Sequence, residues 1–210
     1  MKPTEALTEN QNGLDLQQYW EKAMPYAEYR ALFQEQAENG RTSGPQQTEA
    51  LINYTQLNDR RSRRWEKRFK VDGELQSQLE QLNKPQRWLV LNESWCGDAA
   101  HTVPIMQKLA ELTDKIEVRV LWRDENLELM DAYLSQGTRG IPKLLILNER
   151  NEVAGEWGSR PEPLHQLVQE AKDENGKLPA DFKEEIQKWY NQDKGQTTVR
   201  ELEALVLSLE

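Results

Sequence analysis

The chain has 210 residues, of which 37% are hydrophobic and 30% are charged, and its formal net charge is −9. This negative charge argues against nucleic acid as a partner, and no apolar stretch is long enough to span a membrane. The single cysteine excludes an internal disulfide, and the N-terminus lacks the apolar region of a signal peptide. We therefore expect a cytoplasmic protein that does not associate with membranes.

The first third of the chain has the apolar spacing of helices. One pattern begins at Leu16 and is interrupted by Pro25, and a loop is predicted at residues 39–45, which hold two glycines and a proline. The helix after this loop is expected to bury one apolar stripe, made up of Leu51, Tyr54 and Leu57. We interpret residues 1–69 as an N-terminal helical extension.

This last helix continues into a basic run from Arg60 to Lys70, with seven basic residues in eleven. Such a run could bind an anion or RNA. It could equally be a solvated helix end, whose cations suit the negative end of the helix dipole and face acidic surface elsewhere. We favour the second interpretation, because a single basic cluster carries no recognisable nucleic-acid-binding signature.

The middle of the chain alternates between strand and helix patterns, which predicts an α/β fold. Asp72 is expected to begin a short helix, and Asp124 is expected to cap a later one. The apolar runs predict strands at 88–91, 116–121, 143–147 and 152–157, the last two as a hairpin, and helices after Cys96, after Asp124 and at 163–172.

Two further helices are predicted beyond residue 172. The first carries an apolar face of Phe182, Ile186, Trp189 and Tyr190. The second is expected to begin at Thr198, which has capping-box spacing to Glu201. We interpret residues 173–210 as a C-terminal helical extension that packs on the same body.

Cys96 lies where the strand at 88–91 ends and a helix is predicted to begin. A sulfur at a helix N-terminus faces unpaired backbone N–H groups and the positive end of the dipole, which favour the thiolate. We therefore expect a lowered thiol pKa and a reactive group. Asp98 acts in the opposite direction, because its carboxylate would repel the thiolate and raise the pKa.

Two segments resemble the thioredoxin family. Trp95-Cys96-Gly97 is similar to the start of the family's Trp-Cys-Gly-Pro-Cys site, and Pro104 stands where the family carries a helix-kinking proline. Residues 137–145 resemble the segment that bears the family's cis-proline. The resemblance implies a thioredoxin-like domain over residues 70–172, flanked by the two helical extensions.

The sequence also departs from the family pattern. Ala99 replaces the second cysteine and Asp98 replaces the proline before it. Val90 stands in place of the buried acid that assists proton transfer, and Asn92 in place of a tryptophan. An internal dithiol cycle is therefore excluded, and the chain resembles a divergent, single-cysteine branch.

By this resemblance Cys96 is the catalytic candidate. The substrate-binding candidates are Trp95, Gly97, Asp98, Arg139, Gly140, Ile141 and Pro142. We expect monothiol exchange in cell redox homeostasis, with a protein or low-molecular-weight thiol or disulfide as the partner. The alternative is a non-catalytic protein that binds peptides or acts as a scaffold, so whether the chain is an enzyme stays open.

No metal or cofactor is expected, because two histidines and one cysteine provide no zinc motif. His101 lies five residues after Cys96, which turns it to another side of the predicted helix. An iron–sulfur cluster shared between two chains through Cys96, as in monothiol glutaredoxins, is a further alternative, but the flanking residues resemble thioredoxin instead. The sequence leaves the oligomeric state open.

Overall fold

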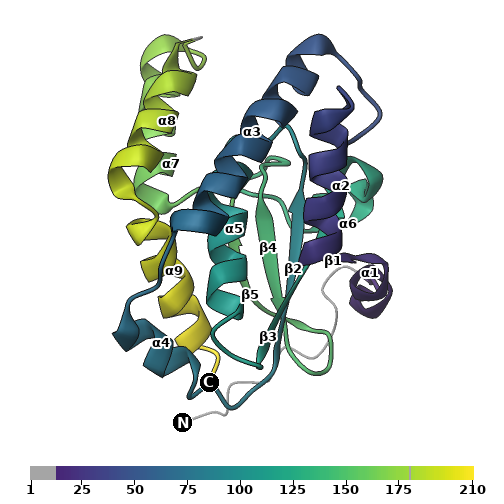
Figure 1. Ribbon diagram of the computed structural model, residues 1–210, viewed down its shortest axis with the longest axis vertical. Helices are drawn as coiled ribbons and strands as arrows, with labels where there is room; N and C mark the ends of the chain where they lie inside the picture. Colours follow the sequence, from purple (N-terminus) through teal and green to yellow (C-terminus); the bar gives the residue numbers. More distant parts are fainter. Residues whose placement is uncertain (1–12, 180) are drawn as a thin grey trace.

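The computed structural model describes residues 13–179 and 181–210, so the first twelve residues of the predicted extension lie outside the described residues. One five-stranded sheet runs through the molecule in the order β1-β3-β2-β4-β5 (Figure 1). Its strands are β1 (Met24–Pro25), β2 (Gln86–Asn92), β3 (Ile116–Trp122), β4 (Lys143–Leu147) and β5 (Val153–Gly158). β2 and β3 are parallel, whereas the other neighbouring pairs are antiparallel.

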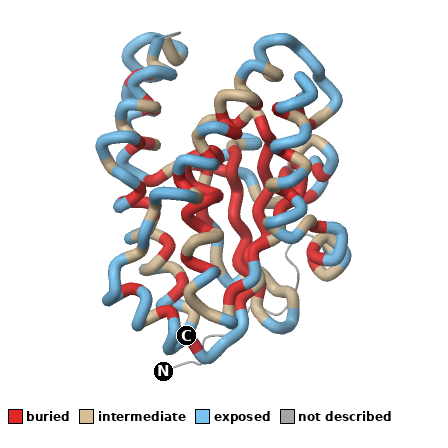
Figure 2. Tube along the Cα trace, viewed as in Figure 1, coloured by how far each residue is buried: buried red, intermediate tan, exposed pale blue. Residues whose placement is uncertain are grey.

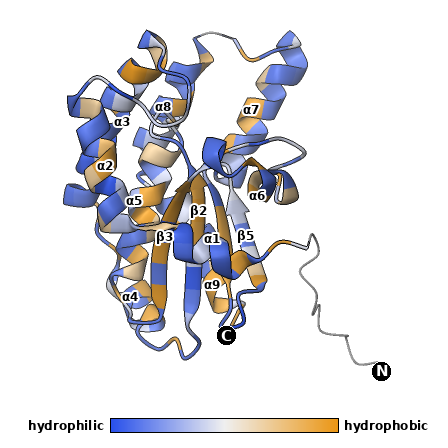
Figure 3. Cartoon of the chain, turned by 90° about the vertical axis from the view of Figure 1, so that its right-hand side faces the viewer, coloured by the Kyte–Doolittle hydropathy of each residue, from blue (hydrophilic) through white to orange (hydrophobic). Residues whose placement is uncertain are grey.

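Helices cover both faces of this sheet, with α3 and α5 on one face and α6 on the other (Figures 1 and 3). The helices are α1 (Leu16–Lys22), α2 (Tyr26–Glu38), α3 (Glu49–Arg68), α4 (Gly73–Leu79), α5 (Ala99–Ala110), α6 (Leu127–Ala132), α7 (Glu162–Asn175), α8 (Phe182–Asp193) and α9 (Gln196–Leu207). A short 3₁₀ turn, η1 (Arg123–Glu125), precedes α6. The predicted β-α-β-α-β-β-α order from β2 to α7 is confirmed, and so is the α/β, thioredoxin-like fold.

The core is centred on β2. Trp88, Leu89, Val90 and Leu91 are all 0% exposed. Because helices pack on both faces, β2 reads as a continuous apolar run instead of an alternating one. Figure 2 shows the buried chain concentrated in the strands and in α5, and Figure 3 shows the hydrophilic residues gathered on the outer helices. No helix in the described part of the chain is long and apolar enough to cross a membrane.

α3 faces the core with its polar side, and the predicted burial of its apolar stripe is wrong. Thr55 and Asn58 are fully buried, whereas Leu51, Tyr54 and Leu57 are only half-buried. Thr55 Oγ1 lies 3.0 Å from the hydroxyl of Ser94, and the Asn58 amide donates to the Ser94 carbonyl at 3.2 Å. These bonds satisfy the buried polar groups, so α3 can turn its apolar stripe away from the core.

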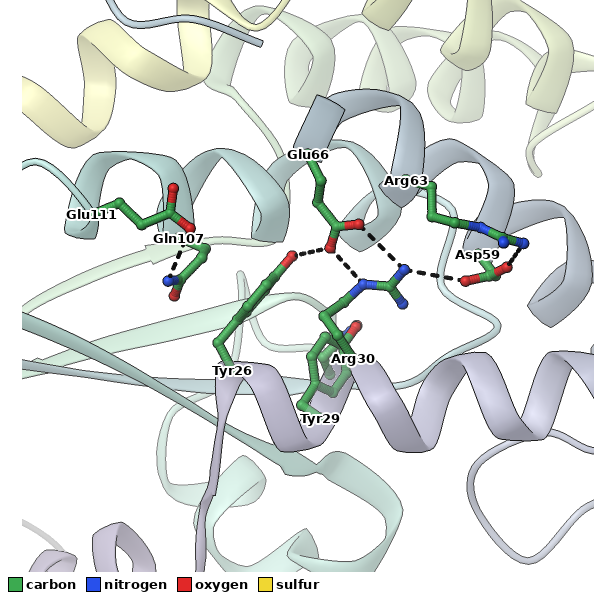
Figure 4. A network of polar contacts seen from close by, with 9 residues as sticks. Tyr26, Tyr29, Arg30, Asp59, Arg63, Glu66, Gln107 and Glu111 are labelled. Atoms are coloured by element: carbon green, nitrogen blue, oxygen red, sulfur yellow. Dashed lines mark hydrogen bonds and ion pairs between the residues drawn. The ribbon is translucent and has the colours of Figure 1, made fainter. Parts of the chain in front are cut away.

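A charged network joins α2 to α3 (Figure 4). Arg30 pairs with Glu66 at 2.5 Å and with Asp59 at 3.1 Å, and Arg63 also pairs with Asp59. The Tyr26 hydroxyl donates to Glu66 at 2.7 Å. Because the network bonds the first turn of α2 to two turns of α3, it helps to fix the rotation of α3 that presents the apolar stripe outward.

The helix after β3 begins later than predicted. Asp124 lies in η1, and Asn126 is the residue that precedes α6. The Asp124 carboxylate pairs with Arg123 at 2.7 Å, and its backbone N–H donates to Glu93 at 2.8 Å. These contacts hold Asp124 away from the helix terminus that it was expected to cap.

The last helix begins earlier than predicted. α9 starts at Gln196, after Gly195 in the left-handed conformation, so Thr198 lies inside its first turn. The Glu201 carboxylate accepts hydrogen bonds from the Trp157 indole at 2.7 Å and from the Glu162 backbone at 2.8 Å. Glu201 is thus committed to tertiary contacts in place of the predicted capping box.

Candidate functional site

Two segments separated by 45 positions meet at the thiol. Cys96 lies in the turn between β2 and α5, and its Sγ donates to the carbonyl oxygen of Ile141 at 3.2 Å. The Ile141–Pro142 peptide bond is cis, as predicted. The structure therefore confirms that the two thioredoxin-like segments converge at Cys96.

The thiol borders a cleft of about 760 Å³ between α3 and α8. Seven of the eight predicted site residues line it, namely Trp95, Cys96, Gly97, Asp98, Arg139, Gly140 and Ile141. Pro142 is buried beside them and does not line the cleft. Most of the other lining residues come from α3, with its apolar stripe, and from α8, which carries Ile186 and Gln187 to the opposite side.

Three arginines of the cleft were not among the predicted site residues. Arg61 donates to Asn58 at 2.9 Å, and Arg160 pairs with Asp98 at 2.7 Å. Arg123 lies with its guanidinium 5.1 Å from the centre of the Trp95 ring. Only Arg61 carried a signal in the sequence, as part of the basic run, because nothing local marks the other two as neighbours of a cysteine.

The thiol is held in its protonated form, so the expected lowering of its pKa is wrong. Cys96 is 7% exposed, and burial together with the Asp98 carboxylate raises the pKa of the Cys96 thiol to about 12. The backbone N–H groups of Ala99 and Asp98 do lower it, as a helix terminus should. That stabilisation is smaller than the cost of taking the thiolate out of water.

Asp98 has both carboxylate oxygens engaged within the protein. Its Oδ1 accepts from the Tyr190 hydroxyl at 3.0 Å, and its Oδ2 pairs with Arg160. Burial raises the pKa of Asp98, while the Arg160 guanidinium lowers it. Through these bonds Asp98 ties α8 to the turn that carries Cys96.

His101 is a structural neighbour of the site. The Trp65 indole donates to His101 Nδ1 at 2.9 Å, which leaves the proton on Nε2, where it is donated to Gln187 at 2.8 Å. The ring stacks on Tyr190 with the ring centres 4.3 Å apart, and burial lowers the pKa of His101 to about 4. Both nitrogens are therefore occupied, and the neutral ring makes no bond to Cys96.

Glu93 carries a buried carboxyl group at the start of the same turn. It accepts hydrogen bonds from the Ser43 hydroxyl and from the Asp124 backbone. Burial raises the pKa of Glu93 to about 7. In the described part of the chain, no three histidine, cysteine, aspartate or glutamate side chains lie close enough together to hold a metal ion.

Replacing Glu93 with glutamine should flatten the pH dependence of stability below neutrality. In the folded chain the pKa of Glu93 is about 7, whereas the ordinary pKa of a glutamate side chain is 4.5. The folded state therefore binds more protons than the unfolded state in this window, and stability falls as the pH rises. Urea unfolding measures the free energy of unfolding at each pH. Between about pH 5 and 7 this free energy should fall by about 2 kcal/mol more in the natural protein than in Glu93→Gln. His101 has the opposite slope but is present in both proteins, and equal slopes would contradict the prediction.

The fold and the paired segments at Cys96 define a thioredoxin-like protein. A family profile described as thioredoxin matches residues 44–172, more than half of the chain. The chain belongs to the thioredoxin family. The match begins inside the predicted N-terminal extension, at the loop before α3.

Two solved structures share the fold. One is a protein of unknown function from Pseudomonas aeruginosa, with 14% identity and a TM-score of 0.58, over 91% of this chain and 96% of that one. The other is an HIV epitope-scaffold, with 16% identity and a TM-score of 0.60, over 93% of this chain and 99% of that one. No curated protein matches the sequence. At these identities the two structures support the fold alone.

Proposed function

We propose that the protein carries out monothiol thiol–disulfide exchange through Cys96, in the cytoplasm and as part of cell redox homeostasis. The observation that carries the proposal is that the Cys96 sulfur borders a cleft of substrate size, directly beside the backbone of Ile141. Arg139, Gly140 and Ile141 line the same cleft and offer an edge along which an extended substrate would lie. The substrate is a protein or low-molecular-weight disulfide.

The exchange takes place in two steps. Cys96 loses its proton to solvent, and the thiolate attacks one sulfur of the substrate disulfide. The Cys96–substrate S–S bond forms, the substrate S–S bond breaks, and the second sulfur leaves as a thiolate that takes up a proton. An external low-molecular-weight thiol, after losing its own proton, then attacks the substrate sulfur of the mixed disulfide. An S–S bond between this thiol and the substrate forms, the Cys96–substrate S–S bond breaks, and Cys96 leaves as a thiolate that is reprotonated. The external thiol is required because Ala99 supplies no internal one.

A second candidate function is non-catalytic peptide binding. The raised thiol pKa favours it, because nearly all of Cys96 is protonated at neutral pH. In this case the cleft holds the peptide through its apolar α3 wall and its arginines. Cys96 then only donates its hydrogen bond to Ile141.

Incubation with glutathione disulfide at about pH 8 distinguishes the two functions. Under exchange, mass spectrometry should find one glutathione attached to Cys96, released by dithiothreitol, and Cys96→Ser should acquire none. Mixed disulfides captured from cell extract should map to the same residue. If no adduct forms, while a peptide binds the natural protein and Cys96→Ser equally well, the exchange proposal is wrong and the binding function replaces it.

A further inference from the structure

A second pocket, of about 890 Å³, lies between the end of α3, the segment after it and α9. The chain that leaves α3 runs beside α9 toward α4 at this place (Figure 1). Five cationic side chains line the pocket, namely Arg64, Arg68, Lys70, Lys194 and Arg200. We propose that it binds a small molecule in which phosphate groups are joined to an aromatic ring, such as a nucleoside diphosphate.

Among the residues that the structure describes, the cations of this pocket have no acidic partners. Arg64 donates to the Asn191 side chain at 2.7 Å, and Arg200 donates to the Thr197 hydroxyl at 3.0 Å. In the described part of the chain, the side chains of Arg68, Lys70 and Lys194 make no hydrogen bond or ion pair. Cations brought together from segments more than a hundred residues apart repel one another, and an anion between them would relieve that repulsion.

The acidic side chains at the pocket do not neutralise it. Asp72 accepts the backbone N–H of Leu75 at 2.9 Å and so serves as the cap of α4. Glu203 is the other carboxylate of the lining and forms no ion pair with the five cations. The lining therefore keeps a net positive charge in a protein whose total charge is −9. Phosphate groups are the ligands that clustered arginines and lysines bind best.

An apolar and aromatic surface lies between these cations. Trp65, Phe69, Val71 and Val199 line the pocket, and the rings of Trp65 and Phe69 pack with their centres 5.8 Å apart. Gly195 has a φ of +81°, and a side chain there would lie 3.2 Å from both rings, so the turn before α9 passes directly over them. This close approach brings Lys194 to the edge of the aromatic surface. Trp65 is buried under this turn, whereas Phe69, Val71 and Val199 are only partly buried, so a planar ring can pack on their exposed parts while its phosphates reach the cations.

The size of the pocket favours a small ligand over a nucleic acid. Its volume falls in the range of sites for small molecules, and the overall negative charge would repel a long polyanion. The pocket is distinct from the cleft beside Cys96, since Asn191 is the one described residue that lines both. The inference is therefore independent of the proposed exchange reaction.

Isothermal titration calorimetry with ADP tests the proposal on the full chain. We expect saturable binding to one site, competition by inorganic pyrophosphate, and weaker binding by adenosine. The double variant Arg68→Gln with Lys194→Gln should bind ADP at least about tenfold more weakly, because it removes two charged donors. The matched control is Lys67→Gln, an exposed cation of α3 that does not line the pocket. This control should keep the natural affinity, as should Cys96→Ser.

Four results would overturn the proposal. Titration without saturation would show that there is no site, and an equal loss of affinity in Lys67→Gln would show attraction to net charge alone. Loss of ADP binding in Cys96→Ser would place the ligand in the other cleft. A single-stranded oligoribonucleotide that binds more tightly than ADP and displaces it would assign the pocket to RNA. Circular dichroism spectra that match the natural protein confirm that the double variant is folded.

Discussion

Iodoacetamide should modify Cys96 about a hundredfold more slowly than it modifies free cysteine at neutral pH. A pKa of about 12 for Cys96, against about 8.5 for a free thiol, lowers the thiolate fraction by more than three orders of magnitude. A more basic thiolate is intrinsically more nucleophilic, so its rate constant rises by between about one and two orders of magnitude and partly offsets this loss. The measurement is the alkylation rate as a function of pH, with free cysteine as the reference. A rate that levels off near pH 8 would contradict the burial argument.

The Asp98→Asn variant identifies the electrostatic part of this effect. The substitution removes the carboxylate that raises the Cys96 pKa. It also removes the anionic partner of Arg160, whose positive charge lowers the Cys96 pKa. The alkylation profile should therefore move to lower pH, although burial keeps it above that of free cysteine. The matched control is Glu184→Gln, because Glu184 also lines the cleft but is not a cause of the thiol shift. An equal displacement in both variants would indicate a general charge effect.

Local sequence patterns were enough to predict the strand, the helix and the proline segment that surround Cys96. The apolar run of β2, the helix after Cys96 and the segment before Pro142 each have a signature within about ten residues, and the structure confirms their convergence. The resemblance to thioredoxin added the cis bond, which spacing alone would not indicate. Features defined by adjacent residues were thus accessible from the sequence.

The properties of the thiol depended on distant residues. The helix-terminus argument considered only the backbone around Cys96, whereas its burial arises from the surrounding fold. Arg160 and Tyr190 reach Asp98 from 62 and 92 positions away, and the sequence contains no mark of either contact. The rotation of α3 was missed for the same reason, since Ser94 satisfies its buried polar side. Burial and long-range polar partners therefore had to come from the structure.

Replacing Ala99 with cysteine should raise disulfide reduction above the background that we expect of the natural chain. The natural chain should give only background turnover in an insulin-reduction assay with thioredoxin reductase, because no internal thiol can release the mixed disulfide. Residue 99 lies three positions after Cys96 at the start of α5, where side chains three apart are neighbours. An internal thiol in such a position can reach an effective molarity of about 10⁵ M or more. We expect turnover to rise at least about tenfold above background. A much larger increase is not expected, because the raised pKa of Cys96 keeps the attacking thiol mostly protonated.

The Ala110→Cys variant is the matched control for this experiment. It makes the same substitution in the same helix, also at a buried alanine, but about 16 Å further along the axis, where its sulfur cannot reach Cys96. Mass spectrometry provides a second readout, because oxidised Ala99→Cys should lose two hydrogen atoms as an internal disulfide forms, while the control should not. If Ala99→Cys forms this disulfide and still gives background turnover, the missing sulfur is not what prevents reduction. Turnover by the natural chain at the rate of a dithiol enzyme would instead contradict the monothiol mechanism itself.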